Sequence, residues 1–218
     1  VPFITWLGAS PGLTWLDAGC GNGAFTEDIV AAGAAAVSAI DPAQGQIDYA
    51  RRRPALSQVD FRVGDAQHLP YGDATFDLAV MALAIAFIPD PARAVAEMAR
   101  VTRPGGQVAT YMWDLPGGGL PLKPIYGALK AMGMDSPVPP SAEASRRERL
   151  HEIWQAAGLQ AVETEVIRIA VTFTDFEDFW RSNSVPVGPV GKFIETLTPE
   201  ANEQLRARLR GTLPTAAD

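Results

Sequence analysis

Short apolar runs alternate with helix-like segments through the first half of this 218-residue chain, and this alternation limits its fold more than any other feature. The apolar runs predict strands at residues 13–16, 36–40, 59–63, 76–82 and 107–112. The segments between them predict helices at residues 24–32, 43–53 and 91–100. This order is typical of βαβ units, whose right-handed crossovers predict an α/β fold with an open, doubly wound, mostly parallel sheet.

Acidic residues follow the predicted strands. Asp17, Asp41 and Asp65 lie where the first three strands end, and Trp113-Asp114 follows the fifth. In an open parallel sheet the carboxyl ends of the strands border the binding crevice. We therefore expect these side chains to lie around one site.

A glycine-rich turn, Asp17-Ala18-Gly19-Cys20-Gly21-Asn22-Gly23, joins the first predicted strand to its helix. Glycines at such a turn let a ligand approach the backbone closely, and the spacing formally fits a dinucleotide pattern. However, Asp17 would repel a pyrophosphate beside Gly19. It would attract a ligand with an ammonium and a sulfonium, and S-adenosylmethionine carries both.

Two further carboxylates fit an adenosine-containing ligand. Asp41 lies 18 residues after Gly23, where a carboxylate can accept the ribose hydroxyls of either NAD or S-adenosylmethionine. Asp65 is placed to accept from an adenine amino group, and the backbone N–H of Ala66 can reach a ring nitrogen. The dinucleotide interpretation has no such requirement after the third strand.

Composition excludes several classes of protein. The formal net charge of −7 argues against nucleic acid as a partner. The longest apolar run, residues 78–88, has 11 residues, whereas a membrane-spanning helix needs about 20. A single cysteine, Cys20, excludes an intrachain disulfide and fits a cytoplasmic location, and two histidines provide no zinc site.

Several blocks of the chain together resemble class I S-adenosylmethionine-dependent methyltransferases, of the type 11 branch that includes ubiquinone- and menaquinone-biosynthesis-like enzymes. The matching blocks are residues 16–23, Asp41-Pro42, Gly64-Asp65-Ala66, Leu69-Pro70, Phe76-Asp77 and residues 103–106. The resemblance implies a Rossmann-like methyltransferase fold and S-adenosylmethionine as cofactor. It implies cofactor contacts from Asp17, Gly19, Cys20, Gly21, Asn22, Asp41, Pro42, Gln46, Asp65, Ala66 and the backbone near Met81.

The second half of the chain is less regular. Helices are predicted near residues 125–132, 142–157 and 199–209, and residues 162–172 alternate like a sixth strand. No segment after Pro199 predicts the antiparallel seventh strand of the methyltransferase fold. We expect one domain over residues 1–218, with acceptor-side excursions near residues 115–141 and 183–191.

The predicted function is methyl transfer from S-adenosylmethionine to a small-molecule acceptor. Phe87, Trp113 and Asp114 are the candidate acceptor contacts, and no residue is identified as a catalytic base. Two alternatives stay open: a protein that binds the cofactor or its product without transferring methyl, and an NAD(P)-dependent oxidoreductase. The acceptor and the oligomeric state are not predicted.

Overall fold

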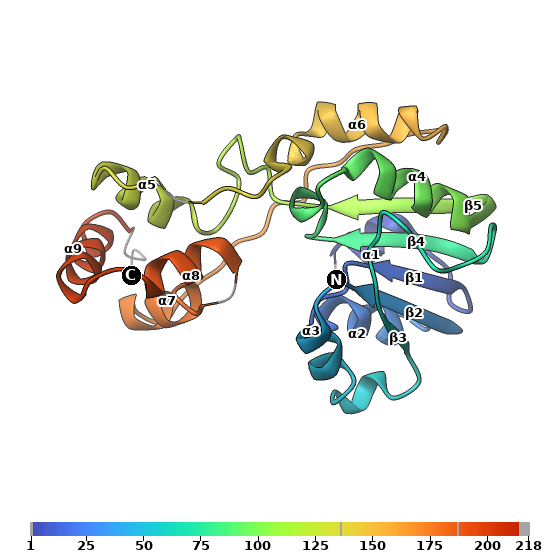
Figure 1. Ribbon diagram of the computed structural model, residues 1–218, viewed down its shortest axis with the longest axis horizontal. Coiled ribbons are helices and arrows are strands. Elements are labelled where there is room, and N and C mark those ends of the chain that lie inside the picture. Colours follow the sequence, from blue (N-terminus) through green and yellow to red (C-terminus); the bar gives the residue numbers. More distant parts are fainter. Residues whose placement is uncertain (1, 136, 187, 214–218) are drawn as a thin grey trace. The chain divides into compact units, whose positions relative to one another are not determined.

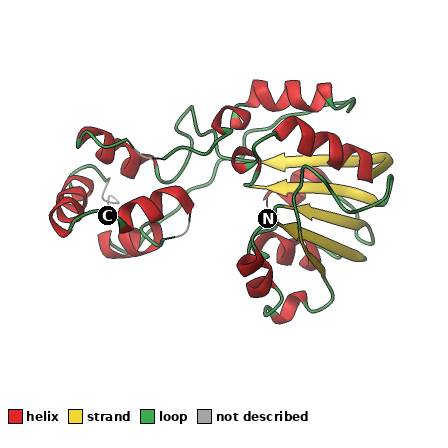
Figure 2. Cartoon of the chain, in the orientation of Figure 1, coloured by secondary structure: helices red, strands yellow, loops and turns green. Residues whose placement is uncertain are grey.

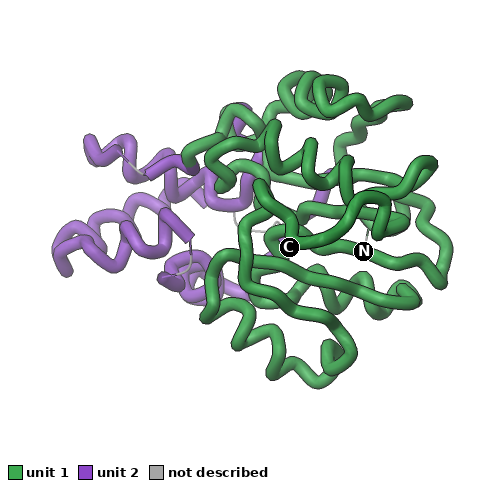
Figure 3. The backbone as a smooth tube through the Cα atoms, turned by 45° about the vertical axis from the view of Figure 1, so that its right-hand side comes forward, with its two compact units in different colours: residues 1–116, 140–167 green, residues 117–139, 168–218 purple. Residues whose placement is uncertain are grey.

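The computed structural model describes residues 2–135, 137–186 and 188–213. It divides into two compact units, which Figure 3 colours separately. The first consists of residues 1–116 and 140–167, and the second of residues 117–139 and 168–218. The expected excursion near residues 115–141 therefore falls mostly in the second unit. Its role at an acceptor site, like that of residues 183–191, stays a prediction, as does a single domain over residues 1–218.

The first unit is built on a sheet of five parallel strands in the order β3-β2-β1-β4-β5 (Figure 1). The strands are β1 (Thr14–Ala18), β2 (Ala36–Asp41), β3 (Asp60–Val63), β4 (Phe76–Ala82) and β5 (Thr102–Tyr111). The chain order changes direction at β1, since β2 lies on one side of it and β4 on the other. This confirms the predicted open α/β fold and puts the carboxyl ends of β1 and β4 at the topological switch point.

Helices cover both faces of this sheet (Figure 2). One face packs against α1 (Pro2–Leu7), α2 (Ala24–Ala31) and α3 (Gln44–Ala50), and the other against α4 (Pro91–Val101) and α6 (Arg147–Ala156). Three single 3₁₀ turns, η1 (Pro54–Leu56), η2 (Ile85–Phe87) and η3 (Ala142–Ser145), lie in the connections. The predicted helix over residues 142–157 is therefore η3 followed by α6.

The core follows the alternation of side chains along each strand. In β1, Trp15 packs with Phe25 and Ile29 of α2, whereas the next residue, Leu16, packs with the α4 and α6 side. Both β1 residues are almost completely buried. Because both faces of the sheet are covered, the central strand β4 is apolar and buried along most of its length, with Asp77 near its start as the exception.

β5 begins earlier than predicted. Its first residue is Thr102, and Pro104, Gly105 and Gly106 lie within the strand instead of forming a separate turn before residue 107. The pairing register between β4 and β5 shifts after Phe76, and Gly105 has a φ of +79°. Between Thr102 and Gln107 the pairing is irregular, and this interruption of the register accommodates the proline and the glycines, for which the local sequence pattern had predicted a turn.

The predicted sixth strand at residues 162–172 is wrong. In this part of the described chain those residues form no strand, and Val166, Ile169 and Val171 are each at least half exposed. The apolar alternation is present, but a strand also needs a neighbouring strand for its backbone hydrogen bonds. The described residues hold no antiparallel seventh strand either, so the sheet that they form has five strands.

The second unit is helical. It contains α5 (Lys123–Ala131), α7 (Phe176–Asn183), α8 (Gly188–Glu195) and α9 (Pro199–Arg210) around a core that includes Leu129, Trp180 and Leu205. Arg206 of α9 stacks over the Trp180 ring at 5.1 Å and pairs with Glu177 at 2.6 Å. Among the described residues of either unit, no helix combines the length and apolar character needed to span a bilayer.

Candidate functional site

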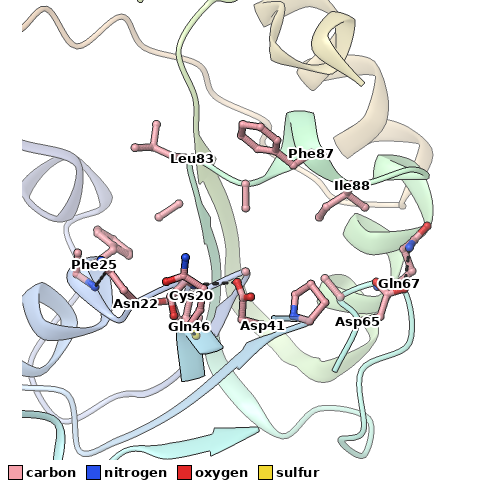
Figure 4. A pocket seen from close by; sticks show the side chains of 18 of the residues that line it. Cys20, Asn22, Phe25, Asp41, Gln46, Asp65, Gln67, Leu83, Phe87 and Ile88 are labelled. Carbon is pink, nitrogen blue, oxygen red and sulfur yellow. Dashed lines mark hydrogen bonds between the residues drawn. The ribbon is translucent and has the colours of Figure 1, made fainter. Parts of the chain in front are cut away.

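A cavity of about 680 Å³ opens at the carboxyl ends of the strands of the first unit (Figure 4). It is lined by residues of β1, β2, β4 and β5 and by the loops that follow them. Most of the predicted site residues lie on it, namely Asp17, Gly19, Cys20, Gly21, Asn22, Asp41, Pro42, Gln46, Asp65, Ala66 and Phe87. Residues that are up to 70 positions apart in the chain thus meet at one cavity, at the carboxyl ends of the parallel strands.

The turn between β1 and α2 lies against the backbone of β2. The N–H groups of Gly19 and Cys20 both donate to the carbonyl of Ile40, at 2.8 and 3.1 Å. Gly19 has a φ of +79°, and a Cβ at this position would come within 2.7 Å of Ala84 Cβ. Any side chain here would strain the backbone and press into the wall of the cavity, so the turn requires glycine.

Asp41, the last residue of β2, organises this turn. Its Oδ2 accepts from the N–H of Gly21 at 2.9 Å, and its Oδ1 accepts from the N–H of Ala43 at 2.9 Å. A carboxylate has about four lone-pair sites, so each oxygen keeps capacity for one more donor. Asp41 can thus hold two neighbouring hydroxyl groups of a ligand while it fixes the loop beside them.

Asp17 lies in β1 with its side chain completely buried. The Thr26 hydroxyl donates to its Oδ2 at 2.7 Å, but its Oδ1 has no hydrogen-bond partner among the described residues. Burial raises the pKa of Asp17 to about 7, and the Asp41 charge adds to this, against the opposing effect of the Thr26 hydrogen bond. An unpaired, desolvated carboxylate oxygen at a cavity favours a ligand that brings a positive charge or a donor.

Asp65 follows β3 and is held by a residue that the sequence analysis missed. The N–H of Gln67 donates to Oδ1 at 2.9 Å and its side-chain amide donates to Oδ2 at 2.8 Å (Figure 4). Gln67 also lines the cavity and accepts from the N–H of Asp90 at 3.0 Å through its Oε1. It therefore connects Asp65 to the start of α4.

Cys20 fills the turn rather than serving as a nucleophile. Its side chain is buried, and burial, followed by the charges of Asp17 and Asp41, raises the pKa of its thiol. A thiol that stays protonated is a poor nucleophile, since the thiolate is the reactive form.

Three predicted residues are absent from the cavity lining among the described residues: Met81, Trp113 and Asp114. Met81 is fully buried in the core on the α4 side, and its carbonyl accepts from the Thr110 hydroxyl at 2.7 Å. The adjacent residues Ala82 and Leu83 line the cavity instead. Ligand contacts by Met81, Trp113 and Asp114 stay predictions.

The cavity also contains residues that sequence reasoning did not select. Phe25 lies in the first turn of α2, and Tyr111 ends β5. Leu83, Ala84, Phe87, Ile88 and Pro89 form an apolar wall after β4. Of these, Leu83, Phe87 and Ile88 lie across the cavity from Phe25 in Figure 4. The rule that selected Trp113, the residue just past the predicted strand end, would have selected Tyr111 if that end had been placed two residues earlier.

The electrostatic character of the cavity is uniform. Its charged lining residues are Asp17, Asp41 and Asp65, and no lysine, arginine or histidine is among the described lining residues. Such a site repels a phosphate-bearing ligand and attracts a cationic one. Its geometry suits a ligand with a positively charged end and a hydroxyl-bearing part, surrounded by apolar walls.

Comparison with known proteins agrees with this chemistry. A family model described as a methyltransferase domain matches residues 16–110. A demethylmenaquinone methyltransferase of Renibacterium salmoninarum is 35% identical over 141 residues, which are 62% of this chain and 58% of that protein. A malonyl-acyl-carrier-protein O-methyltransferase of Erwinia pyrifoliae is 34% identical over 176 residues, which are 80% of this chain and 62% of that protein. The chain thus spans about three fifths of the length of these two relatives.

Solved structures share the fold. A protein from an antibiotic biosynthesis pathway of Anabaena variabilis matches with a TM-score of 0.68 over 96% of this chain and 83% of its own, at 18% identity, and so supports the fold alone. The (4+2)-cyclase SpnF matches with a TM-score of 0.52 at 26% identity, over 69% of this chain and 52% of its own. The domain match over residues 16–110, the named relatives and the parallel sheet together support a class I S-adenosylmethionine-dependent methyltransferase.

Proposed function

We propose that this protein binds S-adenosylmethionine in the cavity of its first unit and transfers the methyl group to a small-molecule acceptor. The observation that carries the proposal is the unpaired oxygen of the buried Asp17 carboxylate, in a cavity whose charged lining residues are all acidic. An ammonium or sulfonium group of the ligand would supply the missing partner. The family and its relatives support the same reaction.

The rest of the cavity fits the other parts of this cofactor. The spare lone pairs of Asp41 suit the two ribose hydroxyls, and Asp65 with the backbone of Ala66 suits the adenine edge. Pro42 and Gln46 lie beside Asp41 on the cavity wall and suit the adenosine. A cavity of about 680 Å³ falls within the usual range for small-molecule sites of roughly 300–1,000 Å³.

When bound, S-adenosylmethionine supplies a methyl group on a good leaving group. The chain therefore contributes mainly orientation and exclusion of water. Asp41 and the turn at Gly19 fix the ligand at one end, while Leu83, Phe87 and Ile88 keep a neighbouring wall apolar. The described cavity lining holds no histidine or lysine, and no residue is proposed as a general base.

The acceptor is proposed only as a class. Phe87 is 45% exposed at the cavity, where it presents apolar surface to an incoming molecule. One relative is named for demethylmenaquinone and the other for malonyl-acyl-carrier protein, and these two names share no single acceptor. We therefore propose a small molecule with an apolar body. The acidic balance of the chain supports an acceptor other than nucleic acid.

Binding without methyl transfer is the second candidate. The similarity to SpnF, which is a cyclase, supports this second candidate, since a protein of the same fold carries out a different reaction there. An NAD(P)-dependent oxidoreductase has less support, because Asp17 would lie beside the pyrophosphate.

The decisive experiment is calorimetric titration of the protein with S-adenosylmethionine, S-adenosylhomocysteine and NAD in parallel. We expect micromolar binding of the first two and none of NAD. Binding of NAD alone would overturn the proposal. Radiolabelled methyl transfer to a panel of quinols, phenols and carboxylic acids then separates the enzyme from the binding protein: labelled product supports the enzyme, and tight binding without product across the panel favours the second candidate.

A further inference from the structure

Two aromatic rings line the cavity beside Asp17. Phe25 precedes Thr26, whose hydroxyl holds Asp17, and Tyr111 ends the last strand of the sheet. Their ring centroids are 5.4 Å apart at an interplanar angle of 66°, an edge-to-face contact. The Phe3 ring of α1 contacts both, with its centroid 4.7 Å from that of Tyr111 and 5.8 Å from that of Phe25. The three rings hold each other in place, so Tyr111 is a fixed part of the wall.

Tyr111 is not suited to act as a base. Burial raises the pKa of its hydroxyl to about 12, and the charges of Asp17 and Asp28 add to this effect. The hydroxyl therefore stays protonated at neutral pH. Tyr111 and Asp17 both line the cavity, and neighbouring residues of α2 contact them, Phe25 the Tyr111 ring and Thr26 the Asp17 carboxylate. What Tyr111 offers to a ligand is a neutral, electron-rich ring next to a carboxylate.

A carboxylate together with an aromatic ring is a favourable environment for a cation. The face of an aromatic ring attracts a positive charge, and the attraction grows when the site is desolvated. The described lining of this cavity carries no lysine, arginine or histidine that could occupy the ring face instead. The positive charge must therefore come from the ligand.

We propose that the Tyr111 ring, supported by Phe25, contacts the sulfonium of S-adenosylmethionine and makes the site prefer this molecule over S-adenosylhomocysteine. The inference rests on the proposed function. The two molecules share the ammonium, the ribose and the adenine, so Asp17, Asp41 and Asp65 can bind these shared groups in either one. They differ at the sulfur, which is charged before transfer and neutral afterwards. A ring that favours the charged sulfur also weakens binding of the product and so assists its release.

The test compares the affinities for both molecules by calorimetry at pH 8 in the wild-type protein and in variants at position 111. Tyr111→Leu removes the ring, and Tyr111→Phe keeps it. Trifluorinated phenylalanine at the same position keeps the size of the ring but withdraws the negative charge from its face. Tyr49→Leu is the matched control, because Tyr49 is 53% exposed on α3 and lies outside the described cavity lining.

We expect Tyr111→Leu and the fluorinated ring to weaken S-adenosylmethionine binding about 5- to 30-fold more than S-adenosylhomocysteine binding. Tyr111→Phe and Tyr49→Leu should leave the ratio of the two affinities within about twofold of wild type. A loss of folded protein would lower both apparent affinities alike, so the ratio is insensitive to it, and the fluorinated variant covers the case in which the leucine variant fails to fold.

If the Tyr111 variants bound both molecules equally more weakly, or bound both with unchanged affinity, the role of Tyr111 would be overturned and the proposed function would stand. If the wild-type protein bound neither molecule, the proposed function would fail first.

Discussion

The Thr26 hydroxyl donates a 2.7 Å hydrogen bond to one oxygen of Asp17, while the other oxygen of this carboxylate has no hydrogen-bond partner among the described residues. Asp17 is thus held in one orientation by α2 but only half satisfied. A buried carboxylate with an unpaired oxygen destabilises the folded protein when it is ionised, and a bound cationic ligand offsets this destabilisation. Stability and ligand binding are therefore expected to respond in opposite directions when Asp17 is changed.

Asp17→Asn should increase the stability of the ligand-free protein and lower its affinity for S-adenosylmethionine. At pH 8 the ionised Asp17 is destabilising, so its neutral counterpart should raise the free energy of unfolding by about 2–4 kcal/mol in urea titrations. S-adenosylmethionine should bind about 10- to 150-fold more weakly, because a charge-assisted contact is lost. Asp135→Asn, which removes an exposed carboxylate of the second unit, should change neither the stability nor the affinity. A destabilised Asp17→Asn protein with full affinity would contradict both expectations.

The stability of the protein should fall with rising pH as Asp17 ionises. The folded-state pKa of Asp17 is about 7, above its ordinary value of 3.8, so the folded state binds more protons between these values. The contribution of this group to stability is therefore highest below about pH 4, falls as the pH rises toward about 7, and is level above that. The stability difference between Asp17→Asn and wild type, measured by urea unfolding across this range, should grow with pH. A constant difference would show that Asp17 does not titrate there.

Ligand binding should depend on pH in the opposite sense. Because the cation prefers the ionised carboxylate, affinity for S-adenosylmethionine should fall about tenfold per pH unit below pH 7 and level off above it. Binding below pH 7 should also release a proton, which calorimetry in two buffers of different ionisation enthalpy would detect. Asp17→Asn should remove both effects, and a pH-dependent affinity that persists in this variant would assign the titration to another group.

Asp41→Ala should weaken the binding of S-adenosylmethionine and of S-adenosylhomocysteine to the same extent, by about 10- to 150-fold. The variant loses the acceptor for the ribose hydroxyls and also the bond that holds the N–H of Gly21. Calorimetry with both molecules provides the measurement, and Asp60→Ala, at an exposed carboxylate of β3, is the control. Unchanged affinity in Asp41→Ala would exclude the ribose assignment.

Asp77→Ala tests a carboxylate that is structural. Asp77 Oδ2 accepts from the N–H and the hydroxyl of Thr14, at 2.7 and 2.8 Å, and Oδ1 pairs with Arg103 at 2.7 Å. The Thr14 hydrogen bonds lower the pKa of Asp77, so its stabilising effect is present above its ordinary pKa and is lost as the pH falls through the lowered value.

We expect a loss of about 1–3 kcal/mol in the free energy of unfolding of Asp77→Ala. The affinity for S-adenosylmethionine should stay within about twofold of wild type, because Asp77 lies near the start of β4, at the opposite end of the strand from the cavity. Thr14→Val, which removes one of the same hydrogen bonds, should give a smaller loss of stability. A selective loss of affinity in a fully stable Asp77→Ala protein would contradict the structural role.

The grouping of the acidic residues and the glycine turn at one cavity was predictable because its determinants are local. Glycines between a buried strand and a helix, and a carboxylate after each of three strands, are visible in the sequence, and the geometry of parallel sheets then requires these groups to share one edge. Asp17, Gly19, Asp41 and Asp65 all line the cavity for this reason. Their individual hydrogen bonds were not predictable, since Thr26 and Gln67 become partners only through the packing of α2 and the loop after β3.

The sequence by itself thus determined the parallel sheet, the glycine turn and the acidic strand ends, because periodicity and backbone preference act over a few residues. Tertiary structure decided the two places where the local pattern was misleading, the segment 162–172 and the start of β5. Residues 162–172 carry the alternation of a strand but have no strand partner, whereas β5 accommodates Pro104 and two glycines where its pairing with β4 is irregular. It also decided that Phe3, Phe25 and Tyr111 meet, since contacts between distant residues depend on how helices cover the sheet rather than on any local pattern.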